Sequence, residues 1–306
     1  MLTEYVLNPD IFDTSCFTTP EECLAYFKNI VYVLQNDGAL IRNLYNGKWF
    51  SYVKQMNNRH PSSKYILELI AKHKQMRDFK SINQTYPTNC IDWCNEAINS
   101  HSIEPIDGIF VTKNTKIEFK EQQLVTTIEN PEKAKWWENR TSSIRVNREI
   151  NSYLLHLKKI LTISKSLMFI DPYFHPVARP GYFDFEKLIQ AINRPDNPPL
   201  IEIHLCKIDC SIPEFEKSFI ESRLANIIKN CGLTVEVFIW GEFADRYLIS
   251  DIIGISLNKG FDVIDSGNPN ILTTWKRLDR AIKDDIQSEF DPATKRHKLQ
   301  RKFTVS

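Results

Sequence analysis

Hydrophobic and polar positions follow a regular rhythm through the second half of the chain. Short apolar runs predict buried strands over 166–174, 200–208 and 233–240, and a further strand pair over 246–251 and 253–260. Apolar residues spaced by three and four positions predict amphipathic helices over 145–164, 183–193, 213–232 and 271–290. Strands that alternate with helices favour an α/β fold, a layered sheet with flanking helices.

The first part of the chain has a more mixed pattern. Thr19 offers a cap, Pro20 suits a first helical turn, and acids follow, so a helix is predicted from here to Gly38. Further helices are predicted over 62–76 and 92–99, and strands over 5–12 and 105–112. We therefore expect a separate mixed α/β N-terminal domain over 1–130, a polar connection over 131–143, and a second domain over 144–306.

Composition adds limits to this picture. The chain has 306 residues and a formal net charge of +1, so no global field attracts nucleic acid. No apolar run approaches the roughly 20 residues of a membrane span, and no secretion signal is visible. Seven cysteines at irregular spacings suit reduced thiols, so we expect a cytoplasmic protein. The basic tail over 294–306 is either a solvated end or an arm that seeks phosphate.

One short motif carries candidate chemistry. Ala244, Arg246 and Asp251 stand in the order Ala-x-Arg-x4-Asp. If this segment is a strand, positions 244 and 246 point to the same face, so one side chain could attack a phosphate while its neighbour binds the oxygens. Arginine binds phosphate through a bidentate fork, but alanine offers no nucleophile.

This motif resembles the His-x-Lys-x4-Asp signature of the phospholipase D superfamily. The resemblance implies that position 244 holds a nucleophilic histidine in active members, which forms a phosphohistidine. It also implies that Arg246 holds the phosphate and that Asp251 supports the site. No cofactor is implied. The family pattern continues six residues later, where this chain has Asn258 and Lys259, which are candidates to hold phosphate oxygens or simply form a turn.

A divergent branch is more similar. It includes the phospholipase D-like domain at the C-terminus of MIT-domain proteins and bacterial proteins linked to defence or mobile elements. The matching segments are Phe243-Ala244-Asp245-Arg246-Tyr247, Ile253-Gly254-Ile255 and Gly260-Phe261-Asp262. The similarity covers about 145–290. Ala244 then has two explanations: an inactivating replacement of histidine, which we favour, or a natural residue of a module that only binds phosphate.

Two more candidates lie at the polar end of the strand predicted over 166–174, after its apolar residues 166–170. Asp171 lies where chemistry gathers in such sheets, at a strand end, although Asp-Pro also forms ordinary turns. His175 is the nearest imidazole and a candidate general acid, or else a loop residue. The superfamily builds its site from two motifs and one is found here, so either two chains pair to make one site or one site works alone. A homodimer is the prediction that we favour.

Other readings concern metals and the N-terminal domain. Cys90 and Cys94, and His204 with Cys206 and Cys210, have spacings that do not fit common zinc sites, so we predict no metal. The order of four acids, Asp10, Glu68, Asp92 and Asp107, resembles that of PIN-type nucleases, which bind Mg²⁺. A role in protein interaction or substrate guidance is the favoured alternative for this domain.

Together these observations predict a metal-independent phosphodiesterase, a nuclease inactivated at position 244, with a possible place in anti-phage defence or mobile elements. Nucleic acid is the expected partner, with a protein partner for the N-terminal domain, and a membrane is not expected. The rival hypotheses are a module that binds acidic lipid or nucleic acid through phosphate without cleavage, and a structural subunit. The strandedness of the substrate and the need for an activator stay open.

Overall fold

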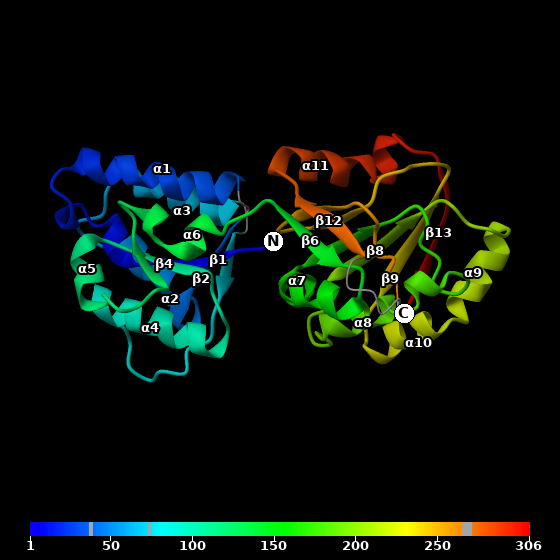
Figure 1. The fold of residues 1–306 in the computed structure, drawn as a ribbon, viewed down its shortest axis with the longest axis horizontal. Coiled ribbons are helices and arrows are strands. Elements are labelled where there is room, and N and C mark those ends of the chain that lie inside the picture. The colour runs from blue at the N-terminus through cyan, green and yellow to red at the C-terminus, as the bar shows by residue number, and fades with distance from the viewer. Residues whose placement is uncertain (37–38, 73–74, 265–270) are drawn as a thin grey trace. The chain divides into compact units, whose positions relative to one another are not determined.

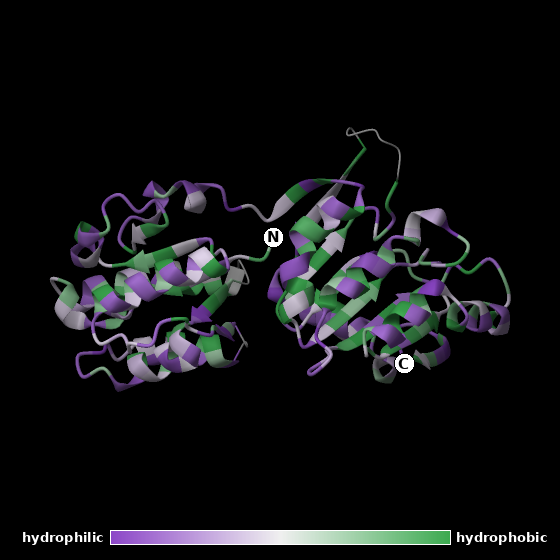
Figure 2. Cartoon of the chain, turned by 90° about the horizontal axis from the view of Figure 1, so that it is seen from below, coloured by the Kyte–Doolittle hydropathy of each residue, from purple (hydrophilic) through white to green (hydrophobic). Residues whose placement is uncertain are grey.

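The computed structural model describes residues 1–36, 39–72, 75–264 and 271–306. The chain folds into two compact units, Leu2–Thr141 and Met1 with Ser142–Ser306, which are called here the N-terminal and C-terminal units. Figure 2 shows hydrophobic residues along the strands of both sheets and hydrophilic residues on the outward sides of the helices. Both units are mixed α/β structures. Within the described ranges, no helix combines the length and apolar composition needed to cross a bilayer.

The N-terminal unit is built on a wholly parallel sheet in the order β3-β2-β1-β4-β5. Its strands are β1 (Glu4–Leu7), β2 (Leu40–Asn43), β3 (Met76–Asp78), β4 (Gly108–Val111) and β5 (Val125–Thr127). Every residue of β1, β2 and β4 is buried, as expected when helices cover both faces of a parallel sheet. Figure 1 shows α1, α3 and α6 on one side and α2 and α4 on the other.

The helices of this unit connect the parallel strands. They are α1 (Pro20–Asn36), α2 (Leu44–Gln55), α3 (Ser63–Lys72), α4 (Cys90–Ile103), α5 (Lys113–Glu118) and α6 (Lys135–Glu138), with short 3₁₀ turns η1 (Pro9–Phe12), η2 (Thr14–Cys16) and η3 (Pro131–Lys133). Helix α1 begins at Pro20 as predicted, and Thr19 Oγ1 accepts a hydrogen bond from the backbone N–H of Glu22 at 3.2 Å. Its predicted end at Gly38, and residues 73–74 of the predicted helix 62–76, lie outside the described residues.

The segment 131–143 differs from its prediction as a connection. Through Thr141 it belongs to the N-terminal unit. The ring of Trp136 lies 5.4 Å from those of Tyr5 and Phe110, and a Cβ on Gly108 would come within 2.3 Å of it. The tryptophan therefore fixes η3 and α6 onto the core, where only glycine leaves room for its ring.

The C-terminal unit has an eight-stranded sheet in the order β13-β9-β8-β7-β10-β11-β12-β6. The strands are β6 (Ser143–Asn147), β7 (Ser166–Ile170), β8 (Leu200–Leu205), β9 (Val235–Trp240), β10 (Tyr247–Ser250), β11 (Gly254–Leu257), β12 (Leu272–Arg277) and β13 (Leu299–Val305). Strands β7, β8 and β9 are parallel, and the other pairs are antiparallel. The parallel centre agrees with the predicted α/β order of elements.

Its helices are α7 (Ile150–Ile163), α8 (Phe185–Ile192), α9 (Ile212–Ile220), α10 (Arg223–Asn230) and α11 (Arg280–Glu289), with turns η4 (Pro180–Tyr182) and η5 (Pro292–Thr294). Three predicted helices are wrong in extent. The start of the helix predicted over 145–164 belongs to strand β6, and the start of the helix predicted over 271–290 belongs to strand β12. The helix predicted over 213–232 is two helices. Ser222 divides it, because its side chain caps α10 by accepting from the backbone N–H of Ala225.

The predicted basic tail also differs. Residues Leu299–Val305 pair with β9 as the edge strand of the sheet, and Phe303 and Val305 are buried. Two of its basic side chains form ion pairs, Arg301 with Glu216 at 2.7 Å and Lys302 with Glu236 at 2.7 Å. Alternating apolar residues thus anchor this segment, so it is neither a frayed end nor a free arm.

Candidate phosphate site at the carboxyl end of β7

Strand register brings the two strongest sequence candidates together. Strands β7 and β10 are antiparallel, and Tyr247 pairs with Ile170. Asp171 directly follows β7 and Arg246 directly precedes β10, so both lie at the same edge of the sheet. The guanidinium Nε of Arg246 lies 3.7 Å from Asp171 Oδ1. The backbone N–H of Leu257 donates to the carbonyl of Arg246 at 2.9 Å, which brings the end of β11 to this edge as well.

Asp171 is the buried centre of this edge, with only 1% of its surface exposed. Its Oδ1 accepts from the backbone N–H of Tyr173 at 3.0 Å. Its Oδ2 accepts from the backbone N–H of Phe261 at 3.1 Å and from the hydroxyl of Tyr182 at 3.0 Å. Burial raises the pKa of Asp171, while these donors and Arg246 act in the opposite direction. The carboxylate therefore ties three segments of the chain to one point.

Gly260 is required by this packing. Its φ is +63°, and a Cβ there would lie 1.9 Å from Asp171 Oδ2 and 2.9 Å from Arg246 Cδ. No side chain fits in that space. A second close approach occurs at Gly181, where a Cβ would lie 1.9 Å from Asp262 Oδ1. Two glycines thus allow the loops after β7 and β11 to close on two carboxylates.

A cluster of aromatic residues packs against these loops. The ring of Phe169 lies 5.0 Å from that of Phe185 and 5.3 Å from that of Phe261, in edge contacts. Phe174 contacts Phe185 and Tyr182 in the same way. Such clusters hold one well-defined packing, so the polar groups above them have fixed positions.

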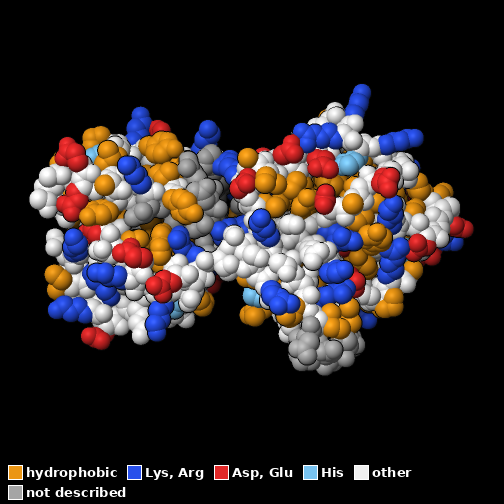
Figure 3. Space-filling view, turned by 45° about the horizontal axis from the view of Figure 1, so that its top comes forward, with side chains coloured by type: hydrophobic (Ala, Val, Ile, Leu, Met, Phe, Trp, Pro, Cys, Tyr) orange, Lys and Arg blue, Asp and Glu red, His pale blue; other side chains and the backbone are white. Residues whose placement is uncertain are grey.

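A cavity of about 500 Å³ opens above this arrangement and is called here the Arg246 cavity. Four cationic side chains line it from separate segments, together with two tyrosines and one carboxylate; they are Arg148, Arg179, Arg246, Lys259, Tyr173, Tyr182 and Asp262. On the face drawn in Figure 3, Lys and Arg side chains are interspersed with Asp and Glu, in agreement with the small net charge. The positive charge available to a ligand is therefore concentrated in the cavity and does not come from the net charge of the chain.

Each arginine of the cavity is held in place. Arg148 pairs with Asp262 at 2.6 Å. Arg179 donates to the carbonyls of Tyr173 and Lys207 and pairs with Asp209 at 2.8 Å. Lys259 makes no ion pair with a residue that the structure describes.

Tyr173 lies between two of the arginines. The guanidinium carbons of Arg246 and Arg179 lie 5.0 Å and 5.5 Å from its ring centroid. Contact with the ring face favours a flat guanidinium with its N–H groups free at the edges. The tyrosine thus helps to keep the Arg246 fork available for an oxygen ligand, whereas Arg179 is already engaged by Asp209 and two carbonyls and adds its charge to the cavity.

Ala244 does not have its predicted setting. Residues 241–246 are irregular, and the strand begins only at Tyr247, so the strand argument that placed 244 and 246 on one face is wrong. Ala244 is exposed and does not line the cavity. It stays two residues from Arg246 in the loop that leads to the site.

Asp251 lies at the other end of β10. Its Oδ1 accepts from the backbone N–H of Lys165 at 2.8 Å and of Ser166, the first residue of β7, at 3.4 Å. The five residues of β7 separate it from Asp171, which is roughly 15 Å at the usual rise of a strand. In this position Asp251 fixes the start of β7 and does not line the cavity.

His175 and Asn258 are also outside the cavity lining. His175 is buried, its Nδ1 accepts from the backbone N–H of Ala178 at 3.1 Å, and its ring meets the edge of Phe215. Burial and Arg179 lower its pKa, which favours a neutral loop residue over a proton donor. Asn258 is exposed beside β12, where its backbone N–H donates to the carbonyl of Thr274.

The histidine weighed for a metal is already engaged. His204 is fully buried, its Nδ1 accepts from Trp240 Nε1 at 3.0 Å, and its Nε2 lies 3.2 Å from Glu202 Oε2. Both nitrogens are therefore occupied.

The four N-terminal acids are dispersed. Asp10 is buried after β1 and accepts from Thr112, whereas Asp107 precedes β4 at the opposite end of the sheet and accepts from the backbone N–H of Glu4. Asp92 lies in the first turn of α4, where its Oδ2 accepts from the backbone N–H of Thr88, and Glu68 is an exposed partner of Lys64. Among the described residues no group of three His, Cys, Asp or Glu could hold a metal ion. The resemblance to a PIN-type carboxylate cluster is therefore wrong.

Several lining residues were missed from sequence. Arg148 fell inside a predicted helix, and Arg179 and Tyr182 lie in a loop without periodicity. Asp262 did stand in a matched motif, Gly260-Phe261-Asp262, but was given no role. The pairing of Arg148 with Asp262, 114 positions apart, has no local signal.

Comparisons with known proteins give distant similarities. No protein-family model and no curated protein matches the chain. Among solved structures, it is similar to Nuc, a phospholipase D family member from Salmonella typhimurium, with 13% identity and a TM-score of 0.34, over 52% of this chain and 98% of that one. It is also similar to TrmBL2, an archaeal chromatin protein with a novel mode of DNA binding, with 15% identity and a TM-score of 0.30, over 91% and 93%. Neither similarity identifies what this chain does.

Proposed function

We propose that the C-terminal unit binds the phosphate of a phosphodiester in the Arg246 cavity, and that a nucleic acid supplies this phosphate. The convergence of Arg148, Arg179, Arg246 and Lys259 on one cavity is the observation that carries the proposal. The planar guanidinium fork of arginine can bind two phosphate oxygens at once, and the amine of lysine binds phosphate as a point charge. The cavity contains both kinds of side chain.

The arginines are held in place, which favours binding of one phosphate group at one position over loose attraction of many anionic groups. Arg246 is fixed by the buried Asp171 and by the ring of Tyr173, so its fork loses little freedom when an oxygen binds. Lys259 lies two residues after the end of β11, next to Gly260, and adds an exposed amine. A ligand phosphate between them would receive charge-assisted hydrogen bonds from two strand ends.

The site as it stands favours binding over cleavage. Among the described lining residues no histidine, cysteine or serine faces the cavity. The hydroxyl of Tyr182 donates to Asp171, and burial together with that carboxylate raises its pKa, so it is a poor nucleophile. Phosphodiester hydrolysis without a metal needs such a nucleophile or an activated water.

A second function rests on the loop that holds Ala244. In the phospholipase D-like pattern a histidine stands there, attacks phosphorus and forms a phosphohistidine. The bond to the leaving oxygen breaks as that oxygen takes a proton, and water then releases the phosphate. With histidine at 244 this chain would be a nuclease of that type. A homodimer and a role in anti-phage defence or mobile elements belong to the same proposal.

Binding is tested first by calorimetry of the full chain with a dinucleoside monophosphate, and with its uncharged methylphosphonate analogue. We expect binding of the charged ligand only. Arg246→Gln should lower the affinity about 10- to 100-fold, because a charged hydrogen bond contributes about 1.5–3 kcal/mol. Arg280→Gln is the matched control, since Arg280 pairs with Asp284 on the exposed side of α11. Equal losses in both variants contradict the proposal.

Cleavage is tested with Ala244→His beside the unchanged chain, on single- and double-stranded DNA and RNA with EDTA present. Cleavage by the histidine variant alone supports the phosphohistidine enzyme. If neither cleaves while Arg246 still controls binding, the phosphate-binding module stands and the nuclease hypothesis is wrong. Anionic lipid vesicles in the same binding assay distinguish a lipid headgroup from a nucleic acid.

A further inference from the structure

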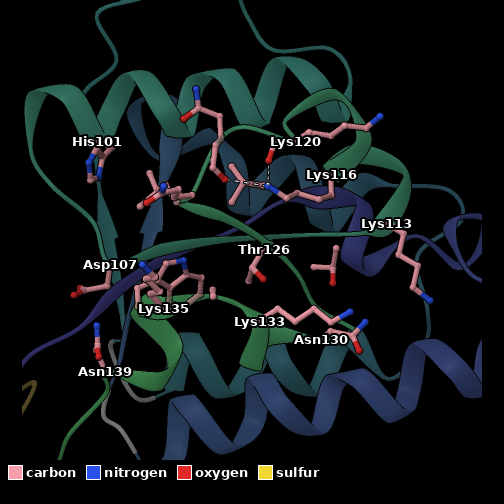
Figure 4. A pocket seen from close by; sticks show the side chains of 17 residues that line it. His101, Asp107, Lys113, Lys116, Lys120, Thr126, Asn130, Lys133, Lys135 and Asn139 are labelled. Atoms are coloured by element: carbon pink, nitrogen blue, oxygen red, sulfur yellow. Dashed lines mark hydrogen bonds between the residues drawn. The ribbon is translucent and has the colours of Figure 1, made fainter.

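A second hollow lies wholly within the N-terminal unit, along the free edge of its sheet. Among the described strands β5 pairs only with β4. Its other side faces a hollow of about 900 Å³ between the turn after α5 and the segment from η3 to α6. It is called here the lysine groove. Figure 4 shows its lining side chains, with α5 on one side of β5 and η3 and α6 on the other.

The charge of this groove is one-sided. Five lysines line it, and the one carboxylate among its described lining residues is Asp107. Asp107 Oδ2 accepts a hydrogen bond from the backbone N–H of Glu4 at 2.7 Å, so this charge is already engaged. Lysines are usually scattered over a surface with acids between them, and a concave cluster of one sign is therefore informative.

One of the five lysines has a structural role. The amine of Lys116 donates to the carbonyls of Phe119, Lys120 and Gln122, which closes the turn between α5 and β5. Burial lowers its pKa. Lys116 thus shapes one wall of the groove and holds up the turn that presents Lys120.

The other four amines are available to a ligand. They belong to Lys113, Lys120, Lys133 and Lys135, all of which are exposed. None of them forms an ion pair with a residue in the described ranges, although Glu22 and Glu129 lie near Lys113. In Figure 4 Lys133 extends toward Asn130, and Lys113 extends from the start of α5.

The groove also has features that a simple anion site lacks. Its volume far exceeds that of one phosphate and lies at the upper end for ligand sites. Amide and hydroxyl groups such as Gln122, Asn130 and Thr126 lie between the lysines, and Leu124, Val125 and Trp136 provide an apolar wall. Separated charges with polar and apolar surface between them match a ligand in which phosphates alternate with sugars and bases.

We infer that the lysine groove binds the sugar-phosphate backbone of a single nucleic-acid strand. The lysines contact phosphates, and the groups between them contact sugars or base edges without reading a sequence. This site belongs to the N-terminal unit alone and does not depend on the Arg246 cavity. An acidic peptide would also meet the lysines but would not need the polar and apolar wall.

The test uses the full chain with Arg246→Gln, so that the cavity contributes little to binding. A labelled single-stranded oligonucleotide is titrated at several salt concentrations. The groove variant replaces Lys113, Lys120 and Lys133 by Gln. The matched control replaces three exposed lysines of the same unit, Lys28, Lys48 and Lys72, by Gln. Thermal unfolding of both triple variants confirms that each is folded.

We expect the groove variant to lose about 10-fold or more in affinity at low salt while the control changes about 2-fold or less. Since each phosphate contact on a single strand adds about 0.7 to the slope of log K against log salt, the slope should fall by about 2 in the groove variant. Equal behaviour of the two triple variants overturns the inference. So does equal competition by polyglutamate, or the absence of binding by the Arg246→Gln chain, and none of these results touches the dinucleotide test of the cavity.

Discussion

The Arg246 cavity and the lysine groove both gather positive charge in a hollow, but they hold it differently. In the cavity, arginines are anchored by carboxylates and by an aromatic ring, and glycines let the loops close around them. In the groove, four exposed lysines have no ion-pair partner among the described residues. One hollow is fixed before a ligand arrives, and the other must order its side chains on binding.

This difference separates two kinds of recognition. Fixed guanidinium forks suit one phosphate in one position, and their effect on affinity is local. Unpaired amines on flexible stems attract many phosphates weakly and release counterions when these bind. We therefore expect the cavity to bind a single phosphodiester and the groove to bind several phosphates of a strand, each in its own unit.

The largest expected effect comes from the close packing of the cavity. Gly260→Ala places a methyl group 1.9 Å from Asp171 Oδ2 at a φ of +63°. We expect a loss of about 3 kcal/mol in the free energy of unfolding, from left-handed backbone strain and overpacking together. Gly232 is the matched control, because its φ is +64° and its Cβ would meet only Pro195 at 4.0 Å. Gly232→Ala should cost about 1 kcal/mol.

Denaturant unfolding of both variants measures this difference. Equal losses would mean that the backbone angle alone matters and that the Asp171 contact does not constrain the site. Dinucleotide affinity should fall in the Gly260 variant and stay unchanged in the Gly232 variant.

The next largest expected difference is in how strongly ligand binding depends on salt in the Arg246 cavity and in the lysine groove. Dinucleotide binding in the cavity depends on one phosphate, so its salt slope should stay below about 1 in magnitude. Oligonucleotide binding through the groove should show a slope of roughly −2 to −3 for three or four lysine contacts. Titrations of both ligands between low and moderate salt give the slopes, and identical slopes would remove the distinction between the hollows.

The buried carboxylate of Asp171 gives the C-terminal unit a dependence of stability on pH. Burial raises the pKa of Asp171, so the folded chain keeps this proton more firmly than the unfolded chain. Its stabilising contribution is full below the ordinary pKa of about 4 and is lost as the pH rises through the raised pKa. Relative to Asp171→Asn, the unchanged chain should therefore lose stability from pH 4 upward and then level off. If the unchanged chain instead gained stability relative to Asp171→Asn as the pH rises, the pKa of Asp171 would be lowered in the folded chain.

The smallest effect concerns the third donor to Asp171. Tyr182→Phe removes one hydroxyl hydrogen bond and leaves the ring that packs on Phe174. We expect a loss of about 1 kcal/mol in unfolding free energy and a modest decrease in dinucleotide affinity, because Asp171 then holds Arg246 less firmly. Tyr32→Phe is the control, since Tyr32 is exposed on α1. An unchanged stability would mean that water replaces the hydroxyl.

Sequence patterns predicted the parts of the site that follow directly from strand ends. Asp171 lies near the end of one predicted strand and Arg246 at the start of another, and antiparallel pairing brings them together. Lys259 comes from the end of the next strand and reaches the cavity. In contrast, the pairing of Arg148 with Asp262 depends on tertiary packing between segments far apart, which no local period encodes.

The errors have related causes. Alternation in Leu299–Val305 covers seven residues rich in charge, so its strand pattern was hidden by basic side chains. Strands β2, β3 and β5 have three or four residues, too few to show a period beside the longer helices. The lysine groove arises from η3, α6 and the turn after α5, a segment that was expected in part to be only a connection. Short elements take their structure from neighbours rather than from their own pattern.

The most direct test of the central claim is a crystal structure of the full chain with a bound dinucleoside monophosphate. The account predicts the phosphate in the Arg246 cavity, with oxygens about 2.7–2.9 Å from the nitrogens of Arg246 and Lys259, as charge-assisted hydrogen bonds require. A phosphate found away from both side chains, with the cavity holding only solvent at saturating ligand, would contradict it.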